Sequence, residues 1–416
     1  MKKKFLFAVA LLMAGIWLVG VAGAATEADK RAAIDAGLAY LATTQNAATG
    51  AFGSGGVDYL NSYTGSALLA FLKEKPNWGA NAAAYQTVVD KGLNYLFSQA
   101  TLVDISSQPA ADGDSNGFGV KFYPGGANSR DTYVTGIVLP AIASTGTPNA
   151  VVNVAGSAVN GWTYKQVVQN TVDYFAYGQN NDGGWRYYAN YGGSDQSTTQ
   201  WPVIGMLFAS QMGVSAPAFV KTELAKWTSY IQNMNPASPY YGAAGYTGPA
   251  PSGYGEVNET GALLIEQAFL GMGIGNANVD AAISFLNNHW KDTASGWDGN
   301  FGNPYAMWAV YKGLELMLGV NDMGTPMTNL HTDPLDVNNP NHGWNWWEDY
   351  CEYLVNSQYA SGAWDGYYNW PTGLATPWYI NILAATKIPD QQVPEPTTIL
   401  LLGLGLAGLG VIRKKM

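Results

Sequence analysis

A short motif recurs along the chain and restricts it to a fold built from repeated units. The motif begins with an aromatic residue followed by an aliphatic or aromatic one. Three residues then separate this pair from a glutamine. A Gly-x-aromatic triplet follows a few residues after the glutamine. Residues 353–364 (YLVNSQYASGAW) carry the motif in full, 40–52 and 174–185 repeat it, and 285–297 carry Trp290 where the glutamine would stand. Such self-similarity predicts a stack of similar structural units.

Each unit is predicted to contain two helices. The first ends near the glutamine, and these helices are expected at 32–43, 85–98, 164–177, 219–231, 279–288 and 346–356. The second follows a glycine-rich turn and is apolar nearly all round, which is typical of buried helices. These are expected at 63–72, 133–143, 199–211, 260–272, 305–318 and 376–386. The sequence therefore predicts twelve helices in six pairs and almost no strand, since strand-type alternation is absent outside short loops.

The residues of the motif have separate structural roles. A glutamine such as Gln358 can hydrogen-bond the free backbone groups at a helix end. Gly362 permits the positive φ that ends a helix, and the apolar face of Trp364 can cover the junction. We therefore interpret the motif as a structural link between neighbouring helix pairs and expect no catalytic role for it.

This pattern resembles the QW repeat of squalene cyclases and the related prenyltransferase repeat, over residues 30–388 approximately. The resemblance implies an all-α fold, an (α/α)6 toroid of six helix pairs in which the inner helices surround a central cavity. An open helical solenoid would use the same elements and is the alternative.

Both ends of the chain have the composition of targeting segments. Residues 1–24 join a basic start, an apolar stretch and Ala22-Gly23-Ala24, which is typical of a secretory signal peptide cleaved after Ala24. An uncleaved membrane anchor is the alternative. The folded domain is then expected over 25–390, and an apolar single helix at 397–412 followed by Arg413-Lys414-Lys415.

The segment 391–416 places Pro394, Glu395 and Pro396 before this apolar run and its basic end. That order resembles the PEP-CTERM sorting signal of bacterial surface proteins. The resemblance implies exosortase as a partner, cleavage near Pro-Glu-Pro, transient association with the inner membrane and a final place at the cell surface or in the extracellular matrix. It also implies a producer that makes exopolysaccharide.

The composition argues for a globular fold and against a nucleic acid partner or an internal disulfide. Only 12% of residues are charged and 47% are hydrophobic, which predicts a large globular core. The formal net charge is −10, and because both ends are basic, the rest is more acidic still. We expect no nucleic acid partner, since phosphate binding needs basic clusters. Cys351 is the single cysteine, so no internal disulfide can form.

The sequence lacks the acid and metal motifs of the families it resembles. Squalene cyclases use an Asp-x-Asp-Asp motif, and the nearest approach is Asp112-Gly113-Asp114 in a predicted loop. Prenyltransferases hold zinc with an Asp-x-Cys pair and a downstream histidine. Asp349-Tyr350-Cys351 is similar to the pair, yet all three histidines precede it. An isoprenoid cyclase is therefore the weakest of the functional hypotheses.

Three carboxylates are predicted to gather at one end of the ring. Asp131, Asp195 and Glu256 each stand four residues before an aligned threonine of a second helix, near its start. They could simply cap these helices. Alternatively, two of them could act as acid and base, or as acid and nucleophile, on a glycan.

Aromatic residues in the turns between paired helices are the candidate ligand contacts. These residues are Tyr188, Tyr241, Tyr254, Tyr368 and Trp370. Exposed rings with polar edges form platforms for sugars, although rings also pack beneath long loops.

One loop has the beginning of a calcium-binding sequence. Asp112, Asp114 and Asn116 follow the order Asp-x-Asp-x-Asn-Gly, but Tyr123 stands where a bidentate glutamate is needed. The alternative is an ordinary turn rich in Asp and Asn. No other cofactor is expected.

Two main hypotheses remain for the function of the folded part. It either binds extracellular polysaccharide or serves a structural role, or it is a glycan-cleaving enzyme that uses the carboxylates at the mouth of the ring.

Overall fold

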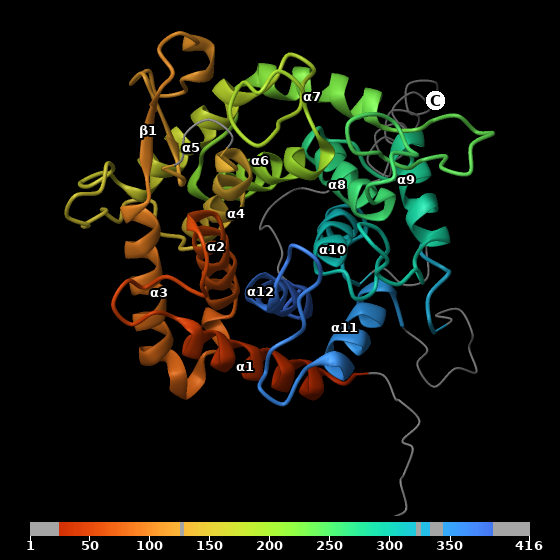
Figure 1. Cartoon of the computed structure of the whole chain (residues 1–416), viewed down its shortest axis with the longest axis horizontal. Coiled ribbons are helices and arrows are strands. Elements are labelled where there is room, and N and C mark those ends of the chain that lie inside the picture. Colours follow the sequence, from red (N-terminus) through yellow and green to blue (C-terminus); the bar gives the residue numbers. More distant parts are fainter. Residues whose placement is uncertain (1–24, 125–128, 322–325, 333–343, 386–416) are drawn as a thin grey trace, which may run out of the picture.

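Outer and inner helices alternate along the chain in the computed structural model, which describes residues 25–124, 129–321, 326–332 and 344–385 (Figure 1). The outer helices are α1 (Glu27–Thr44), α3 (Ala82–Ser98), α5 (Tyr164–Gly178), α7 (Ala218–Ile231), α9 (Ala277–Asn288) and α11 (Trp346–Ser357). The inner helices are α2 (Val57–Lys73), α4 (Asp131–Ala143), α6 (Gln196–Ala209), α8 (Glu256–Phe269), α10 (Pro304–Leu318) and α12 (Thr372–Leu383). The twelve predicted helices in six pairs are thus confirmed within the described residues.

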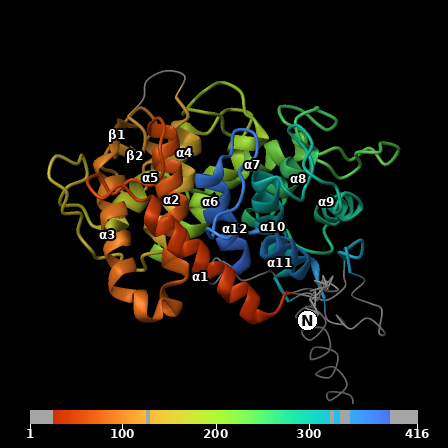
Figure 2. The same ribbon diagram turned by 60° about the horizontal axis from the view of Figure 1, so that its bottom comes forward.

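The inner helices form a closed ring. Each packs against the next along the chain, and α12 packs against both α10 and α2. Figures 1 and 2 both place α12 between these two helices. The outer ring closes as well, because α1 contacts α11 and α12. The open solenoid is therefore wrong for the part of the chain that the structure describes.

Glutamines connect four of the six outer helices, α1, α5, α7 and α11, to the next outer helix, as predicted for the motif. Each side-chain Nε2 donates to the carbonyl of its own turn glycine and to a carbonyl of the following outer helix. The second acceptors are Val88 of α3 for Gln45, Val220 of α7 for Gln179, Asn278 of α9 for Gln232 and Ala33 of α1 for Gln358, at 2.8 to 3.0 Å. The last of these bonds joins the end of the ring to its beginning.

Tryptophans complete these junctions. Trp185 and Trp364 are buried, and the indole N–H of each donates to a carbonyl of the preceding outer helix at 2.8 Å. Trp290 takes the place of the glutamine after α9, and its indole N–H donates to Asp349 in the first turn of α11 at 2.8 Å. The motif is therefore a structural link even where its key residue differs.

Threonines near the starts of five inner helices share one contact. The side-chain oxygens of Thr64, Thr135, Thr199, Thr260 and Thr376 each accept a backbone N–H from the turn that precedes their helix, at 3.0 to 3.2 Å. Five of the six inner helices are thus held to their turns in the same way, which places their first turns at a common height.

Several inner helices begin earlier than predicted. α2 begins at Val57 instead of 63, and α8 begins at Glu256 instead of 260. The apolar pattern marks only the buried part of each helix, whereas the first turn faces the mouth of the ring and carries polar residues. Glu256 consequently lies inside the first helical turn.

The second pair departs most from the common plan. Between α3 and α4 the chain forms an antiparallel hairpin of β1 (Thr101–Asp104) and β2 (Phe118–Lys121), which packs against α5. Among the described residues this is the only sheet. The described residues also contain four short 3-10 helices: η1 (Lys75–Asn77), η2 (Gly79–Asn81), η3 (Pro109–Ala111) and η4 (Ser210–Met212).

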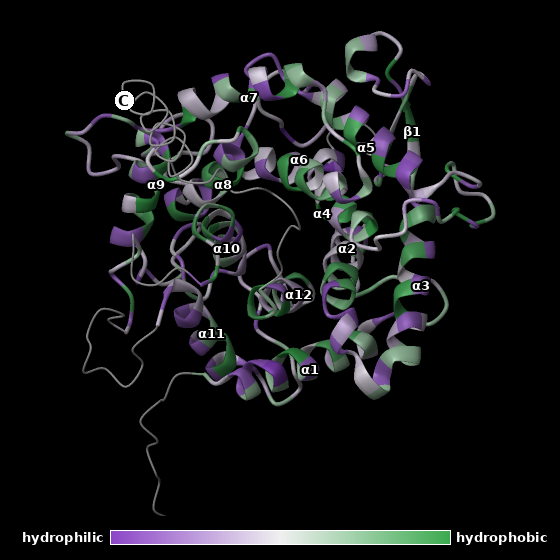
Figure 3. Cartoon of the chain, turned by 180° about the vertical axis from the view of Figure 1, so that it is seen from behind, coloured by the Kyte–Doolittle hydropathy of each residue, from purple (hydrophilic) through white to green (hydrophobic). Residues whose placement is uncertain are grey.

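The hydrophobic core lies between the two rings of helices. Every residue of α10 from Pro304 to Met317 is buried, whereas α1 buries only one side. Figure 3 shows purple, hydrophilic stretches on outer helices such as α1 and α9. Within the described ranges no helix combines the length and the hydropathy needed to cross a membrane. The predicted signal peptide, with its cleavage at Ala24, and the apolar run 397–412 lie outside the described residues.

Candidate ligand-binding cavity

A cavity of about 370 Å³ opens where all six inner helices begin. Every inner helix contributes to its wall from its first two turns. These lining residues are Asp58, Tyr59 and Ser62 of α2, Tyr133, Val134 and Ile137 of α4, Ser197 of α6, Asn258 and Glu259 of α8, Tyr305 of α10 and Leu374 of α12. The turns supply the rest, namely Arg130, Tyr187, Tyr246, Tyr254, Trp297, Asn369 and Trp370. The ring therefore brings together residues that are far apart in the sequence.

Aromatic faces dominate one side of this cavity. The rings of Tyr305 and Trp370 are stacked, with centroids 4.6 Å apart and an angle of 16° between their planes. Trp297 stands edge-on to Trp370 at 5.7 Å and is 38% exposed, so part of its ring faces solvent at the mouth. Tyr246 and Tyr254 form another close pair at 5.3 Å.

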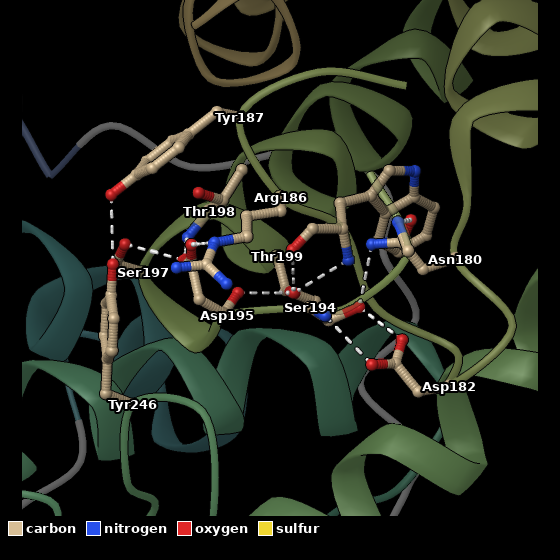
Figure 4. A network of polar contacts seen from close by, with 12 residues as sticks. Asn180, Asp182, Arg186, Tyr187, Ser194, Asp195, Ser197, Thr198, Thr199 and Tyr246 are labelled. Carbon is tan, nitrogen blue, oxygen red and sulfur yellow. Dashed lines mark hydrogen bonds and ion pairs between the residues drawn. The ribbon is translucent and has the colours of Figure 1, made fainter. Parts of the chain in front are cut away.

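Two tyrosines from different turns meet above the first turns of α4 and α6. Their hydroxyl oxygens, on Tyr187 and Tyr246, lie 3.0 Å apart (Figure 4). The carbonyl of Tyr187 accepts the N–H of Thr132 in α4, and that of Tyr246 accepts the N–H of Gln196 in α6. The backbone carbonyls of both tyrosines are therefore bonded to the first turns of α4 and α6.

Two of the five predicted ligand contacts line the cavity, namely Tyr254 and Trp370. Tyr368 packs against Trp297 at 4.9 Å outside the lining, and Tyr188 packs against Tyr191. Tyr241 is exposed and is absent from the cavity wall. Turn composition alone did not indicate which rings face inward.

The predicted carboxylates lie at the starts of α4, α6 and α8, and each is engaged by the protein. Asp131 accepts from Lys121 Nζ at 2.6 Å and from the Thr132 N–H at 3.0 Å. Glu256 accepts from the N–H groups of Ser252 and Gly253 at 2.6 and 3.0 Å. None of the three is part of the cavity wall.

Asp195 is the N-cap of α6 and is completely buried (Figure 4). Its Oδ1 accepts from the Thr198 N–H at 2.7 Å and from the Ser197 hydroxyl at 2.8 Å. Its Oδ2 lies 3.3 Å from Arg186 Nε in an ion pair. Burial raises the pKa of Asp195, while the bonds from Ser197 and Thr198 and the charge of Arg186 act in the opposite direction. Its contacts are those of a structural cap.

Glu259 is the functional candidate that the sequence did not reveal. It lines the cavity, yet its side chain is almost fully buried. Oε1 accepts from Asn258 Nδ2 at 3.3 Å, and Oε2 has no hydrogen-bond partner among the described residues. Burial raises the pKa of Glu259 well above its ordinary value, and the nearby Asp195 adds to the effect. The surroundings of Glu259 therefore favour its protonated form.

In the sequence, only the position of Glu259 relative to Glu256 and Thr260 could have pointed to it. It lies three residues after Glu256 and directly before the aligned Thr260, inside a helix that begins earlier than its apolar pattern suggests. One glutamate beside an apolar run is usually a surface residue, and only closure of the ring turns it toward the cavity.

The predicted calcium loop connects the short η3 segment to β2. Asp112 accepts from the N–H groups of Asn116 and Gly117 at 3.2 and 2.7 Å. Asp114 accepts from Asn116 Nδ2 at 3.2 Å, and Asn116 in turn accepts from the Phe118 N–H at 2.8 Å. The three predicted residues thus lie together in one tight turn, on the outer side of the ring.

Comparison with known proteins identifies the C-terminal segment. Residues 392–415 match the PEP-CTERM protein-sorting motif, which confirms the predicted sorting signal. The predicted processing residues Pro394, Glu395 and Pro396 fall within it, outside the described part of the chain. No curated protein matches the sequence.

Among solved structures, the chain is similar to the type II terpene cyclase MstE from Scytonema. The apo form has 12% identity and a TM-score of 0.47, covering 86% of this chain and 98% of that one. A variant in complex with merosterolic acid A has 13% identity and a TM-score of 0.48, covering 86% and 97%. A variant in complex with geranylgeranyl dihydroxybenzoate has 13% identity and a TM-score of 0.47, covering 86% of this chain and 97% of that one. A likeness this distant carries no conclusion about the chemistry of this chain.

Proposed function

We propose that this chain is an exported binding protein whose cavity receives a sugar unit of an extracellular polysaccharide. The observation that carries the proposal is the combination, in a single cavity, of accessible aromatic faces and hydrogen-bonding groups. Sugar rings have apolar faces that stack on Trp and Tyr, and hydroxyls that need donors and acceptors.

The polar groups of the wall suit the hydroxyls of a saccharide. Asp58 and Asn258 come from opposite sides of the inner ring, and Asn369 adds an amide from the last turn. The cavity volume of about 370 Å³ is at the small end of the range of roughly 300 to 1,000 Å³ for ligand pockets. It suits a short saccharide unit or a chain end better than a long stretch of polymer.

The sorting signal supports an extracellular ligand. The PEP-CTERM motif implies export with sorting by an exosortase, at a membrane that the tail reaches. Cleavage near Pro394, Glu395 and Pro396 would release the folded part from the apolar run 397–412. The cell surface or the extracellular matrix would then be its destination, where the resemblance to PEP-CTERM proteins implies exopolysaccharide.

Replacing Trp297 by alanine is expected to weaken saccharide binding by at least about tenfold, because a stacked ring contributes on the order of 1.4 kcal/mol. Isothermal titration with short gluco-, manno- and galacto-oligosaccharides measures this. Tyr359→Ala is the matched control, since Tyr359 is 50% exposed and outside the cavity. The proposal fails if no saccharide binds the wild-type protein, or if the two variants lose affinity equally.

A second candidate function is glycan cleavage in the same cavity. Burial raises the pKa of Glu259 on α8 and so favours its protonated form. Asp58 lines the same cavity from α2, on the opposite side of the inner ring. Asp58 lies 3.8 Å from Arg130 in an ion pair. A neutral carboxyl can protonate a leaving glycosidic oxygen while a carboxylate across the cavity activates water. Neither residue belongs to the trio that the sequence suggested.

If Glu259 and Asp58 cleave glycans, Glu259→Gln should lower the rate of cleavage at least about 100-fold, because the proton donor is lost. Saccharide affinity should persist, since glutamine has the same shape and still donates a hydrogen bond. Release of reducing ends measures the rate. Glu266→Gln, a buried change on the same helix outside the cavity wall, should retain the activity. If the wild-type protein releases no reducing ends while it binds saccharide, only the binding function stands.

A further inference from the structure

Three carboxyl groups from two elements converge on the outer side of the ring, away from the cavity wall. Asp112 and Asp114 belong to the loop before β2, and Asp173 projects from α5. One oxygen of each lies within 4.8 Å of the other two. No ion pair involves any of them among the described residues. Like charges this close repel each other, so the cluster needs a cation or protons.

Asp173 distinguishes this cluster from an ordinary acidic turn. Its side chain is completely buried. Its Oδ1 accepts from the Gly113 N–H at 3.0 Å and from Gln169 Nε2 at 2.9 Å, whereas Oδ2 has no partner in the described part of the protein. An unpaired buried carboxylate oxygen is costly, and proteins normally avoid it. The arrangement therefore leaves a coordination position on a buried oxygen.

The loop also has the shape that calcium loops use. Gly117, at the sixth position of the sequence motif, has a φ of +83°, which gives the sharp turn required there. The sequence alone argued against calcium, because Tyr123 occupies the twelfth position. In the folded chain Asp173 of α5 supplies a carboxylate to the loop from another element, which removes that objection.

We propose that Asp112, Asp114 and Asp173 bind one calcium ion between this loop and α5. All three ligands are carboxylate oxygens without nearby histidine or cysteine in the cluster, which selects hard cations over zinc or copper. Asn116 keeps its role in the turn, because its amide is already bonded to Phe118 and Asp114. Water fills the remaining coordination positions, as is usual for extracellular calcium sites.

The ion would fix the β1–β2 hairpin to α5 and thereby support the cavity wall. β2 ends at Lys121, whose ammonium is bonded to Asp131 at the start of α4. The next residue, Phe122, donates its N–H to Thr135 of α4 and accepts from Asn61 of α2 through its carbonyl. These two inner helices carry six of the cavity-lining residues.

Calcium should raise the melting temperature of the purified full-length chain by about 3 to 5 °C after prior treatment with a chelator. Isothermal titration should show a single site with a dissociation constant of roughly 0.1 to 1 mM, the range of extracellular calcium modules. Magnesium at the same concentration should give a smaller shift, because it demands a tighter octahedron. An equal response to magnesium would contradict the assignment to calcium.

Asp173→Asn should remove both the heat of binding and the shift in melting temperature. Asp114→Asn, a change to an exposed side chain, serves as a second variant that leaves the core intact. Asp104→Asn, in the same hairpin but outside the cluster, should respond like the wild type. The site is refuted if calcium up to about 10 mM has no effect on the wild-type protein, or if both cluster variants still bind calcium.

Discussion

Replacing Gly362 by alanine is expected to destabilise the protein by about 3 to 5 kcal/mol or to prevent folding. Gly362 has a φ of +89°, and an added Cβ would lie 2.2 Å from the carbonyl oxygen of Ala36 in α1. That oxygen belongs to helix backbone, so relief requires moving α1 away from α11 at the point where the ring closes. The free energy of unfolding in urea measures the effect.

Gly271→Ala is the matched control for this change. Gly271 has a φ of +83°, but nothing lies within 4 Å of the position its Cβ would take. This variant is expected to lose only about 1 to 2 kcal/mol, the cost of the left-handed conformation. If the two variants were equally destabilised, the close contact between the turn after α11 and α1 would be refuted. Gly50, Gly183 and Gly242 meet the next outer helix in the same way, so they should behave like Gly362.

Stability is expected to fall as the pH rises from about 5 to about 7.5. Burial raises the pKa values of Glu259 and Glu266 on α8 well above their ordinary range. The native state therefore keeps these protons above pH 4.5, whereas the unfolded chain releases them. Because the native state then binds more protons, the free energy of unfolding decreases with pH, by up to about 1.4 kcal/mol per pH unit for each such carboxyl. The window ends where Lys73, with a pKa lowered by burial to about 8, begins to act in the opposite direction.

Urea denaturation across this pH range tests the prediction. Glu266→Gln should give a shallower dependence, since the amide keeps the contact with Gln196 and has no proton to lose. Glu223→Gln on the outer helix α7, where Glu223 pairs with Lys226, should keep the wild-type slope. A stability that is constant or rises between pH 5 and 7.5 would show that these carboxyls are not held neutral.

The sequence predicted the helix pairs and their junctions because these depend on local signals. A glycine follows Gln45, Gln179 and Gln358 after four or five residues, with an aromatic residue two positions later, and each glutamine makes the expected bonds. The junction at Gln232 was recognised only as a degraded copy of the motif because its turn is longer, so that Gly242 follows ten residues later. The hairpin between α3 and α4 was missed because its strands are only four residues long.

The candidate sites depended on contacts that no local pattern records. Helix starts suggested that Asp131, Asp195 and Glu256 would lie at one end of the ring, yet none of them lines the cavity. Asp195 caps α6, Asp131 pairs with Lys121, and Glu256 bonds to the turn before α8. Glu259 faces the cavity only because α8 takes a place in a closed ring. Asp173 looked like one polar residue in an outer helix, and the loop that it meets lies about sixty residues earlier in the chain.

The location of a bound saccharide tests the central claim most directly. An X-ray structure of the protein with its tightest-binding oligosaccharide is predicted to show a sugar ring in the cavity at the starts of the inner helices. One face of that ring should lie against Trp297 or Trp370, with its hydroxyls near Asn258 and Asn369. A saccharide bound elsewhere on the protein, while this cavity contains only water, would contradict the account.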